Sequence, residues 1–495
     1  MKNEVILLVA GRGVQALLTI ALFRVLTTLL SPADVGGVYL MISAATLFGM
    51  FLLNPVLMYL NRNLFLWHDA KTVFEHMLGY SGYVLAISAL AFPVVLAAWS
   101  FLGVGAELPG IAFASITACY TSVLNLNQAF LPVLNTLGRK GAFVSLTLAT
   151  SFAALLCSAL FVRIGAASAG MWMWGQVAAI GAVTCIGVLA FLKLIPEPGI
   201  SAARISRYTS KSALLPAARF AIPLSGAAFF MWSQAQSYRV LVEKLNGAEF
   251  LGYLAVGFSI ATSVAGILES LVQQIYLPGF YRAITGGDRA ARAAALGKLV
   301  SKAIPVYLIY LFFLLGTSEY LVRVLVSEKF RAVFVYSRYG AFIEFFRMTT
   351  NILASAAHSE MRTDVLIKPY FFGGIAALAG VYFAALSPAP SICIPLALLA
   401  SGLLTLVIMW RVVARMSGLA LDAAVFVRYA LLSLAFLPLA FFHGGGFVRA
   451  TLALSAAGAY FVWLQYRAAG IHGSDLALGA GRGHEAGLPG PGEDL

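Results

Sequence analysis

Charge is scarce in this 495-residue sequence: Asp, Glu, Lys and Arg together make up 11% of it, whereas hydrophobic residues make up 61% and the mean hydropathy is +0.90. A soluble globular domain carries about 25% charged residues, so a large aqueous domain is excluded and a bilayer surrounds most of the chain. The net charge is +13. Because the basic residues fall mostly in short segments between apolar runs, they indicate membrane topology rather than nucleic-acid binding.

Cysteines and ligand clusters are also nearly absent. All four cysteines lie within apolar runs and have no ligand-like spacing, so neither a disulfide nor a metal site is predicted. The sequence has no phosphate-binding loop, and Gly11-Arg12-Gly13 is too short for a dinucleotide motif. We therefore expect no cofactor and no nucleotide or metal chemistry.

Long apolar runs fill most of the chain. About 20 apolar residues cross a roughly 30 Å hydrocarbon core as a helix. This length predicts an all-α integral membrane protein of fourteen helices, with spans at 5–30, 36–60, 78–104, 110–137, 141–163, 169–194, 216–243, 250–275, 299–326, 333–357, 364–387, 391–416, 424–442 and 446–466. The apolar N-terminus carries Arg12 and Arg24, and we expect it to be retained as the first helix rather than cleaved as a signal peptide.

Positive residues mark one side of the membrane. Lys and Arg gather in alternate connections, including the two longest, 195–215 and 276–298. The connections on the other side are short and carry few positive charges, so both termini are predicted to be cytoplasmic. The Gly-rich tail 467–495 is predicted to be disordered.

An internal repeat organises the chain. Two stretches 215 positions apart share a pattern without a gap, in which Arg24-Val25-Leu26, Leu30, Ala33, Asp34 and Gly37 are matched by Arg239-Val240-Leu241, Leu245, Ala248, Glu249 and Gly252. The match equates the first helix with the seventh. We therefore expect two six-helix lobes, 1–194 and 216–416, related by a pseudo-twofold axis along the membrane normal. Residues 195–215 would link them, and helices thirteen and fourteen, at 424–466, would be appended.

Charged residues deep in the spans are the first candidates for a site. A charge at mid-bilayer costs at least about 2.5 to 3.5 kcal/mol, and the deep charges are the arginines Arg12, Arg24, Arg239 and Arg347 and the acids Glu269 and Glu344. The excess of arginine predicts a cationic cavity and an anionic substrate, because a guanidinium binds phosphate oxygens in pairs. The alternative is that Arg24 and Arg239 extend to the outer interface and anchor helix ends. For Arg12 the sequence supports a position in the cavity and one at the interface equally.

Two helices carry polar stripes at steps of three and four. The stripe on 333–357 includes Glu344, Arg347 and Asn351, and the one on 110–137 includes Asn125 and Gln128. One reading assigns Glu344 and Glu269 to ion coupling and Arg347 to substrate; the other is that Glu344 and Arg347 simply pair. Gln236 adds an amide suited to sugar hydroxyls, with structural hydrogen bonding as the alternative. The stripes that contain Asn125, Gln128 and Asn351 also match the polar stripes that join helices.

The repeated segment also carries a family resemblance. Phe23 to Tyr39, Asn135 to Arg139, and Pro223 through Tyr238-Arg239 to Tyr253 resemble Wzx-like polysaccharide flippases of the multidrug, oligosaccharidyl-lipid and polysaccharide exporter superfamily. The resemblance covers helices one to twelve and implies two lobes around a central cavity that opens alternately to each side. Oligosaccharide members move undecaprenyl-diphosphate-linked glycans to the periplasmic leaflet without ATP hydrolysis. On that model Arg24 and Arg239 hold the diphosphate.

The sequence thus predicts a non-enzymatic flippase of lipid-linked anionic glycan in the bacterial inner membrane. Its expected partners are the lipid-linked glycan, membrane lipids, a coupling ion (H⁺ or Na⁺) and other polysaccharide-assembly proteins. The alternatives are a lipid II flippase, a cation-coupled drug antiporter, and a membrane glycan polymerase or ligase. An enzyme of that last class would be expected to carry a large outer loop with catalytic residues, and the predicted outer loops are only a few residues long.

Overall fold

The computed structural model describes residues 2–195, 211–284, 289–359, 363–417, 423–442 and 446–469, and this part of the chain is helical throughout, as predicted. Its helices make fourteen crossings: α1 (Lys2–Leu29), α2 (Pro32–Phe48) continued by η1 (Gly49–Leu53) and α3 (Asn54–Asp69), α4 (Val73–Leu102), α5 (Gly110–Thr136), α6 (Lys140–Ile164), α7 (Ala169–Leu194), α9 (Lys211–Asn246), α10 (Ala248–Ile284), α11 (Arg289–Leu325), α12 (Phe334–Ser359), α13 (Ile367–Ala385), α14 (Pro390–Ser417), α15 (Ala423–Ser433) continued by η4 (Leu434–Phe441), and α16 (Phe447–Ala469).

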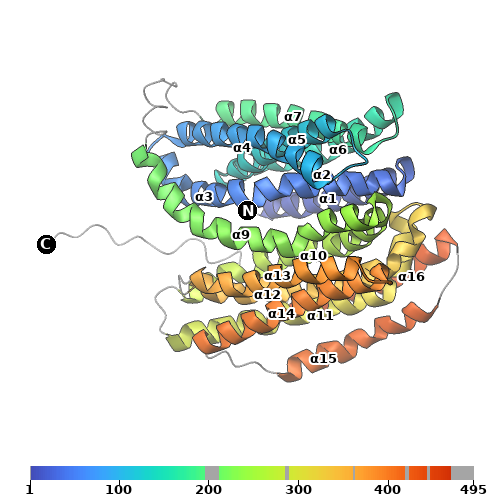
Figure 1. Cartoon of the computed structure of the whole chain (residues 1–495). Helices are drawn as coiled ribbons and strands as arrows, with labels where there is room; N and C mark the ends of the chain where they lie inside the picture. Colours follow the sequence, from blue (N-terminus) through green and yellow to red (C-terminus); the bar gives the residue numbers. More distant parts are fainter. Residues whose placement is uncertain are drawn as a thin grey trace.

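The crossings form two groups that lie side by side (Figure 1). The N-terminal group comprises α1 to α7, and the C-terminal group comprises α9 to α14, in which α9 packs on α13 and α10 on α12. The appended helices α15, η4 and α16 pack on α11. Gly316 lets η4 approach closely, because a Cβ there would overlap the backbone oxygen of Phe436.

Several predicted boundaries were wrong because helices continue past the apolar runs. The predicted connections 61–77 and 276–298 are largely helical, since α3 ends at Asp69, α10 at Ile284, and α11 begins at Arg289. Charged residues are good helix formers, so a polar extension of a membrane helix leaves no hydropathy signal. Within the thirteenth span, 434–441 is a 3₁₀ helix that contains Pro438. The predicted tail lies outside the described residues from position 470 onward.

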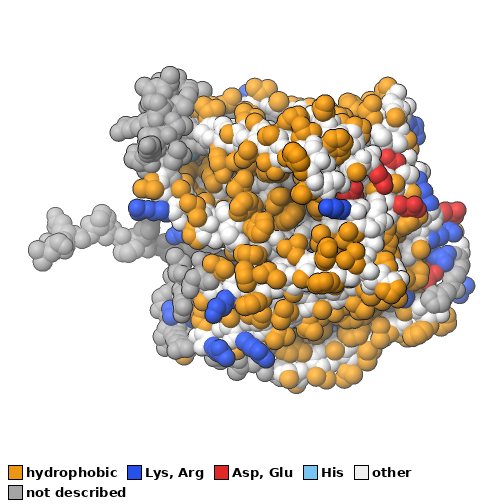
Figure 2. All heavy atoms as spheres, viewed as in Figure 1, with side chains coloured by type: hydrophobic (Ala, Val, Ile, Leu, Met, Phe, Trp, Pro, Cys, Tyr) orange, Lys and Arg blue, Asp and Glu red, His pale blue; other side chains and the backbone are white. Residues whose placement is uncertain are grey.

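Eleven of the crossings are long and apolar enough by composition to span a membrane. The other three in the described chain are α1, α5 and α12; of these, α12 carries Arg338, Glu344 and Arg347. Figure 2 shows hydrophobic side chains over most of the visible flank, with most charged ones toward its two ends. This distribution is that of a multi-pass membrane protein.

The two groups meet closely at one end of the molecule, where α1 passes into α2 and α9 into α10; we call it the closed end. The Ser327 N–H donates to Thr27 Oγ1 at 3.1 Å. The Gly105 N–H lies 3.0 Å from each carboxylate oxygen of Glu243. These bonds join the N-terminal to the C-terminal group.

The centre of the closed end is a crossing of α2 and α10 without side chains between them. A Cβ on Gly36 would overlap the oxygen of Ala248, and a Cβ on Gly252 would overlap the oxygen of Pro32. The two contacts are equivalent by symmetry. Adding 216 to the α2 residue numbers converts Pro32 to Ala248 and Gly36 to Gly252, and this converts one contact into the other. The sequence repeat has a shift of 215, so the contact equates Gly36, rather than the predicted Gly37, with Gly252.

The second crossing contains a π-turn, a feature often found at functional sites. Pro55 follows η1 and lacks an N–H, so a carbonyl about one turn earlier loses its helical donor. Tyr83 of α4 donates to the Leu52 oxygen at 3.1 Å, and Tyr80 to the Leu53 oxygen at 3.4 Å, which joins η1 to α4. The second crossing packs along α9 and brings Met50 to the central cavity.

Candidate functional site

A cavity of about 420 Å³ lies between the two groups of helices. The N-terminal group contributes Phe23, Tyr39 and Met50 to its wall, and the rest comes from the C-terminal group. Its polar lining residues are Tyr39, Gln234, Gln236, Tyr238, Arg239, Ser259, Thr262, Ser263, Glu344, Arg347, Thr350, Asn351, Tyr370 and Thr405. This volume is within the range of small-ligand sites.

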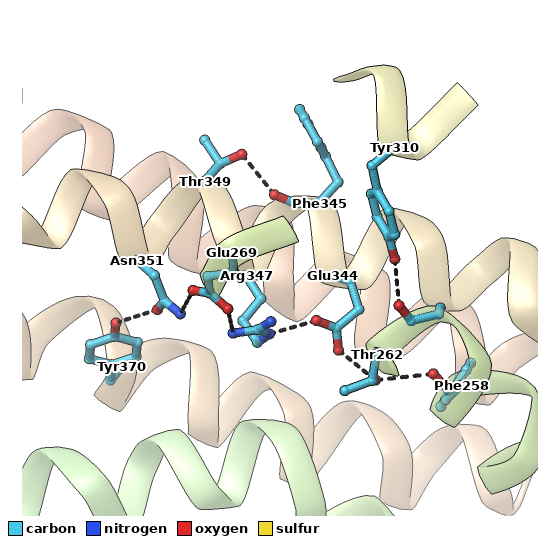
Figure 3. A network of polar contacts seen from close by, with 11 residues as sticks. Phe258, Thr262, Glu269, Tyr310, Glu344, Phe345, Arg347, Thr349, Asn351 and Tyr370 are labelled. Carbon is cyan, nitrogen blue, oxygen red and sulfur yellow. Dashed lines mark hydrogen bonds and ion pairs between the residues drawn. The ribbon is translucent and has the colours of Figure 1, made fainter. Parts of the chain in front are cut away.

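An ion-pair network on α10 and α12 forms one wall (Figure 3). Arg347 donates through Nε to Glu344, one turn earlier, at 2.7 Å. Its Nη1 lies 2.9 Å from Glu269 of α10. The pairing of Glu344 with Arg347, one of the two readings of the sequence, is therefore present, and Glu269 is a second carboxylate that the helical spacing did not reveal.

Amide and hydroxyl groups complete the network. Asn351 donates to the other oxygen of Glu269 at 2.8 Å and accepts from Tyr370 at 3.4 Å, while Thr262 donates to Glu344 at 2.8 Å. Figure 3 shows these side chains converging from three helices on the space beside Arg347. Glu269 and Glu344 thus share the guanidinium of Arg347, and each also accepts a hydrogen bond from one neutral donor.

The charges at this wall come from Arg347 and its two carboxylates. Two carboxylates share one guanidinium, so the Arg347 cluster is formally negative. The charged residues that line the cavity itself are Arg239, Glu344 and Arg347, whereas Glu269 is not among the lining residues. The cluster therefore favours a cation or a proton over an anion.

Arg239, which α9 contributes to the cavity wall, is in a different environment. In the described part of the chain no carboxylate lies within ion-pair distance of it. Its guanidinium carbon lies 5.0 Å from the ring centre of Tyr39 and 5.6 Å from that of Tyr238, and its Nε donates to the Tyr238 hydroxyl at 3.2 Å. These partners are neutral, so Arg239 is the cavity cation best able to bind an anion.

The two glutamines of α9 differ in their use. Gln234 donates to Thr405 at 2.7 Å and to the Ser401 oxygen at 3.2 Å, which joins α9 to α14. Gln236 lines the cavity, and its buried Oε1 has no hydrogen-bond partner among the described residues. An unsatisfied buried amide oxygen is available to a ligand hydroxyl, the chemistry predicted for Gln236.

Three of the remaining predicted residues, Arg24, Asn125 and Gln128, lie outside the cavity wall. Arg24 is exposed at the closed end and donates to the backbone oxygen of Val326, beyond α11. Arg12 lies in α1, but its side chain is outside the described residues. Asn125 is buried and donates to the Thr121 oxygen of its own helix at 2.8 Å. Gln128 is exposed on α5.

Sequence reasoning did not assign site roles to the aromatic and hydroxyl residues. Tyr39, Tyr238 and Tyr370 touch Arg239 or Asn351, and Thr262 touches Glu344. The only signal was position: Tyr238 precedes Arg239, and Thr262 lies seven residues, two helical turns, before Glu269 on α10. No group of three or more His, Cys, Asp or Glu that could hold a metal ion occurs among the described residues.

Comparisons with known proteins reveal the fold. No protein-family model and no curated protein sequence matches the chain. The structure of a multidrug resistance MATE family transporter of the MOP superfamily, in its inward-facing conformation, has a TM-score of 0.63 at 12% identity, over 82% of this chain and 96% of that one. The lipid II flippase MurJ, in an inward closed conformation, has a TM-score of 0.64 at 13% identity, over 94% of this chain and 99% of that one. This chain therefore has the fold of a MOP-type transporter.

Proposed function

We propose that the protein is a flippase that moves a glycan linked to a lipid diphosphate, of the undecaprenyl type, from the cytoplasmic to the periplasmic leaflet of a bacterial inner membrane. The observation that carries this proposal is the cavity. It combines Arg239, which has only neutral partners, with amide and hydroxyl groups suited to sugar. The two structures with the same fold belong to a MATE family transporter and a lipid II flippase, which agrees with a non-enzymatic role.

The flank of the molecule supports a lipid-linked substrate. α2, η1 and α3 pack along α9, with Phe51 and Phe229 rings 5.5 Å apart. On the other flank α1 packs along α6, and no extended packing joins it to α10 within the described helices. Both of these helices carry exposed apolar side chains, such as Leu17 on α1 and Ile267 on α10. A lipid chain could remain in the bilayer at this flank while its headgroup occupies the cavity.

The closed end is assigned to the periplasmic side, as the distribution of Lys and Arg in the sequence predicts. In this arrangement the molecule is closed to the periplasm. Alternating access then requires the contacts at the closed end to separate once the headgroup is bound. A polymerase or ligase is disfavoured because the connections described at this end are short: 103–109 between α4 and α5, and 386–389 between α13 and α14.

Binding of a lipid diphosphate to the purified protein tests the proposal. Arg239→Gln should weaken binding by about ten- to a hundredfold, because one charge-assisted hydrogen-bonding group is lost. Arg239→Lys should restore part of it, since a point charge cannot reproduce paired donors. Arg163→Gln removes an exposed arginine far from the cavity and should bind as the wild type does. Equal binding and glycan export by wild type and Arg239→Gln at equal abundance would contradict the proposal.

A cation-coupled antiporter is the second candidate, and the Arg347 cluster favours it. Two carboxylates around one guanidinium, with oxygens from Asn351 and Thr262 nearby, suit a proton or Na⁺. Under the flippase proposal the same cluster serves ion coupling, as predicted for Glu269 and Glu344. Export of cationic drugs that survives Arg239→Gln but not Glu344→Gln would favour the antiporter.

A further inference from the structure

Arg239 belongs both to the cavity and to the boundary between the two groups of helices. It lines the cavity, yet only 9% of it is exposed. The ring over it at 5.0 Å is that of Tyr39, which α2 contributes from the N-terminal group. Tyr39 lines the same cavity as Ser259 of α10. One tyrosine thus reaches across the boundary and covers the cavity's anion-binding candidate.

The contact is part of one face of α9. Trp232, Gln236, Arg239 and Glu243 recur at steps of four, three and four, which places them on the same side of the helix. Trp232 Nε1 donates to the Ser43 backbone oxygen at 3.2 Å, and Ser43 Oγ donates to the Gln236 backbone oxygen at 3.0 Å. The Glu243 carboxylate accepts from Gly105. This face therefore joins α9 to the N-terminal group, and Arg239 is its cationic member.

The partners of Arg239 are weak compared with an anion. Without a ligand, its guanidinium interacts with two ring faces and one phenol oxygen. A bond between two charged groups is roughly twice as strong as one between neutral groups, and phosphate oxygens match the paired donors of arginine. An anionic group in the cavity should therefore displace Tyr39 from the guanidinium. The contacts of Trp232 and Gln236 with Ser43 and of Glu243 with Gly105 do not involve the anion.

We propose that Arg239 couples occupation of the cavity to opening of the closed end. In the empty protein it holds the two groups together through Tyr39, and a bound diphosphate removes that contact by taking over the guanidinium. The proposal rests on the proposed function, because the anion is the headgroup of that substrate. It adds that the empty protein stays closed to the periplasm and that the substrate itself loosens the closure.

The distance between the groups at the closed end can be measured with spin labels. Ala106→Cys in the α4–α5 connection and Ala332→Cys in η2 (Glu328–Val333) place labels at exposed positions on opposite groups. The four native cysteines are replaced first. The probe is geranylgeranyl diphosphate, and geranylgeraniol, which lacks the phosphates, is its control. The diphosphate should increase the long-distance population in the wild type, and the alcohol should not.

Variants separate the ring contact from its surroundings. Tyr39→Leu should raise the open-to-closed ratio without ligand by roughly 2- to 30-fold, the range that a cation–π contact corresponds to. Tyr39→Phe keeps the ring and loses only its hydroxyl, so it should remain near the wild type. Tyr238→Leu removes the other ring beside Arg239. Because Tyr238 lies on the same helix as Arg239, this change breaks no contact of Arg239 across the boundary and should shift the ratio less than Tyr39→Leu does. In Arg239→Gln the diphosphate should no longer change the distance.

The outcomes distinguish this proposal from the function on which it rests. If the wild type binds the diphosphate and the distance does not change, coupling through Arg239 is overturned, whereas the anion site stands. If the wild type does not bind it, the anion site itself is wrong. A Tyr39→Leu ratio equal to that of the wild type also overturns the coupling. Should that variant fail to fold, the wild-type and Arg239→Gln distances decide alone.

Discussion

The polar helices α5 and α12 have similar patterns of sequence but different surroundings. On α12 the stripe faces the cavity and bonds to other helices, through Glu344, Arg347 and Asn351. On α5 the stripe bonds within its own helix, where Thr121 donates to the Thr117 oxygen and Asn125 to the Thr121 oxygen. A periodic stripe therefore predicts which face of a helix is polar, but not what that face contacts. The charged part of the site belongs to the C-terminal group.

Loss of Arg347 should have the largest effect, because it leaves two carboxylates facing each other. We expect Arg347→Gln to reduce stability by about 1.5 to 3 kcal/mol, the value of hydrogen bonds to charged groups. Melting of the detergent-purified protein measures this. The triple variant with Glu269→Gln and Glu344→Gln should regain most of the loss. If it regains none, the cluster is not held by charge pairing.

Gly36 tests whether the closed end depends on direct backbone contact. Gly36→Ala should force α2 and α10 apart and cost about 1 to 3 kcal/mol, as overpacking does elsewhere. The closed end should then open more often, which the spin-label distance reports. Gly266→Ala on α10 is the control, since nothing lies within 4 Å of its added Cβ. Equal distances in both variants would show that the α2–α10 crossing does not determine closure.

Glu344 separates ion coupling from simple pairing. If it takes part in coupling, Glu344→Gln should slow glycan export and flatten its dependence on pH or sodium at unchanged abundance. If it only neutralises Arg347, adding Arg347→Gln and Glu269→Gln should recover what the single change lost, because Arg347 also pairs with Glu269. Full recovery in the triple variant would exclude the coupling role.

Asn125 and Asn351 provide the smallest and most direct comparison of the two helices. Asn125→Ala should cost about 0.5 to 1.5 kcal/mol and leave export unchanged, because its bond is made within α5. Asn351→Ala removes a donor from Glu269 and should alter the ion dependence of export. A change of ion dependence in Asn125→Ala would mean that α5 also contributes to the site.

Hydropathy and periodicity predicted the architecture well, and the partners of the charged residues poorly. Fourteen crossings follow from chain length in a bilayer, and the Glu344–Arg347 pair follows from their spacing along α12. The approach of Glu269 to Arg347 depends on how α10 packs on α12, which one sequence does not encode locally. The different partners of Arg24 and Arg239 could not be predicted either. Their sequence contexts match, whereas the residues opposite them, Val326 and Tyr39, do not.

The crossing of Pro32 and Gly36 with Ala248 and Gly252 has a consequence for assembly. Gly36 meets Ala248, the counterpart of Pro32, and Pro32 meets Gly252, the counterpart of Gly36, which is how a residue patch meets itself in a twofold homodimer. Either six-helix half, produced alone, would thus present a self-complementary patch. When the two halves are expressed separately, homodimers of each half should accordingly compete with the pairing of one half with the other. In the single chain, covalent linkage selects the second of these two pairings.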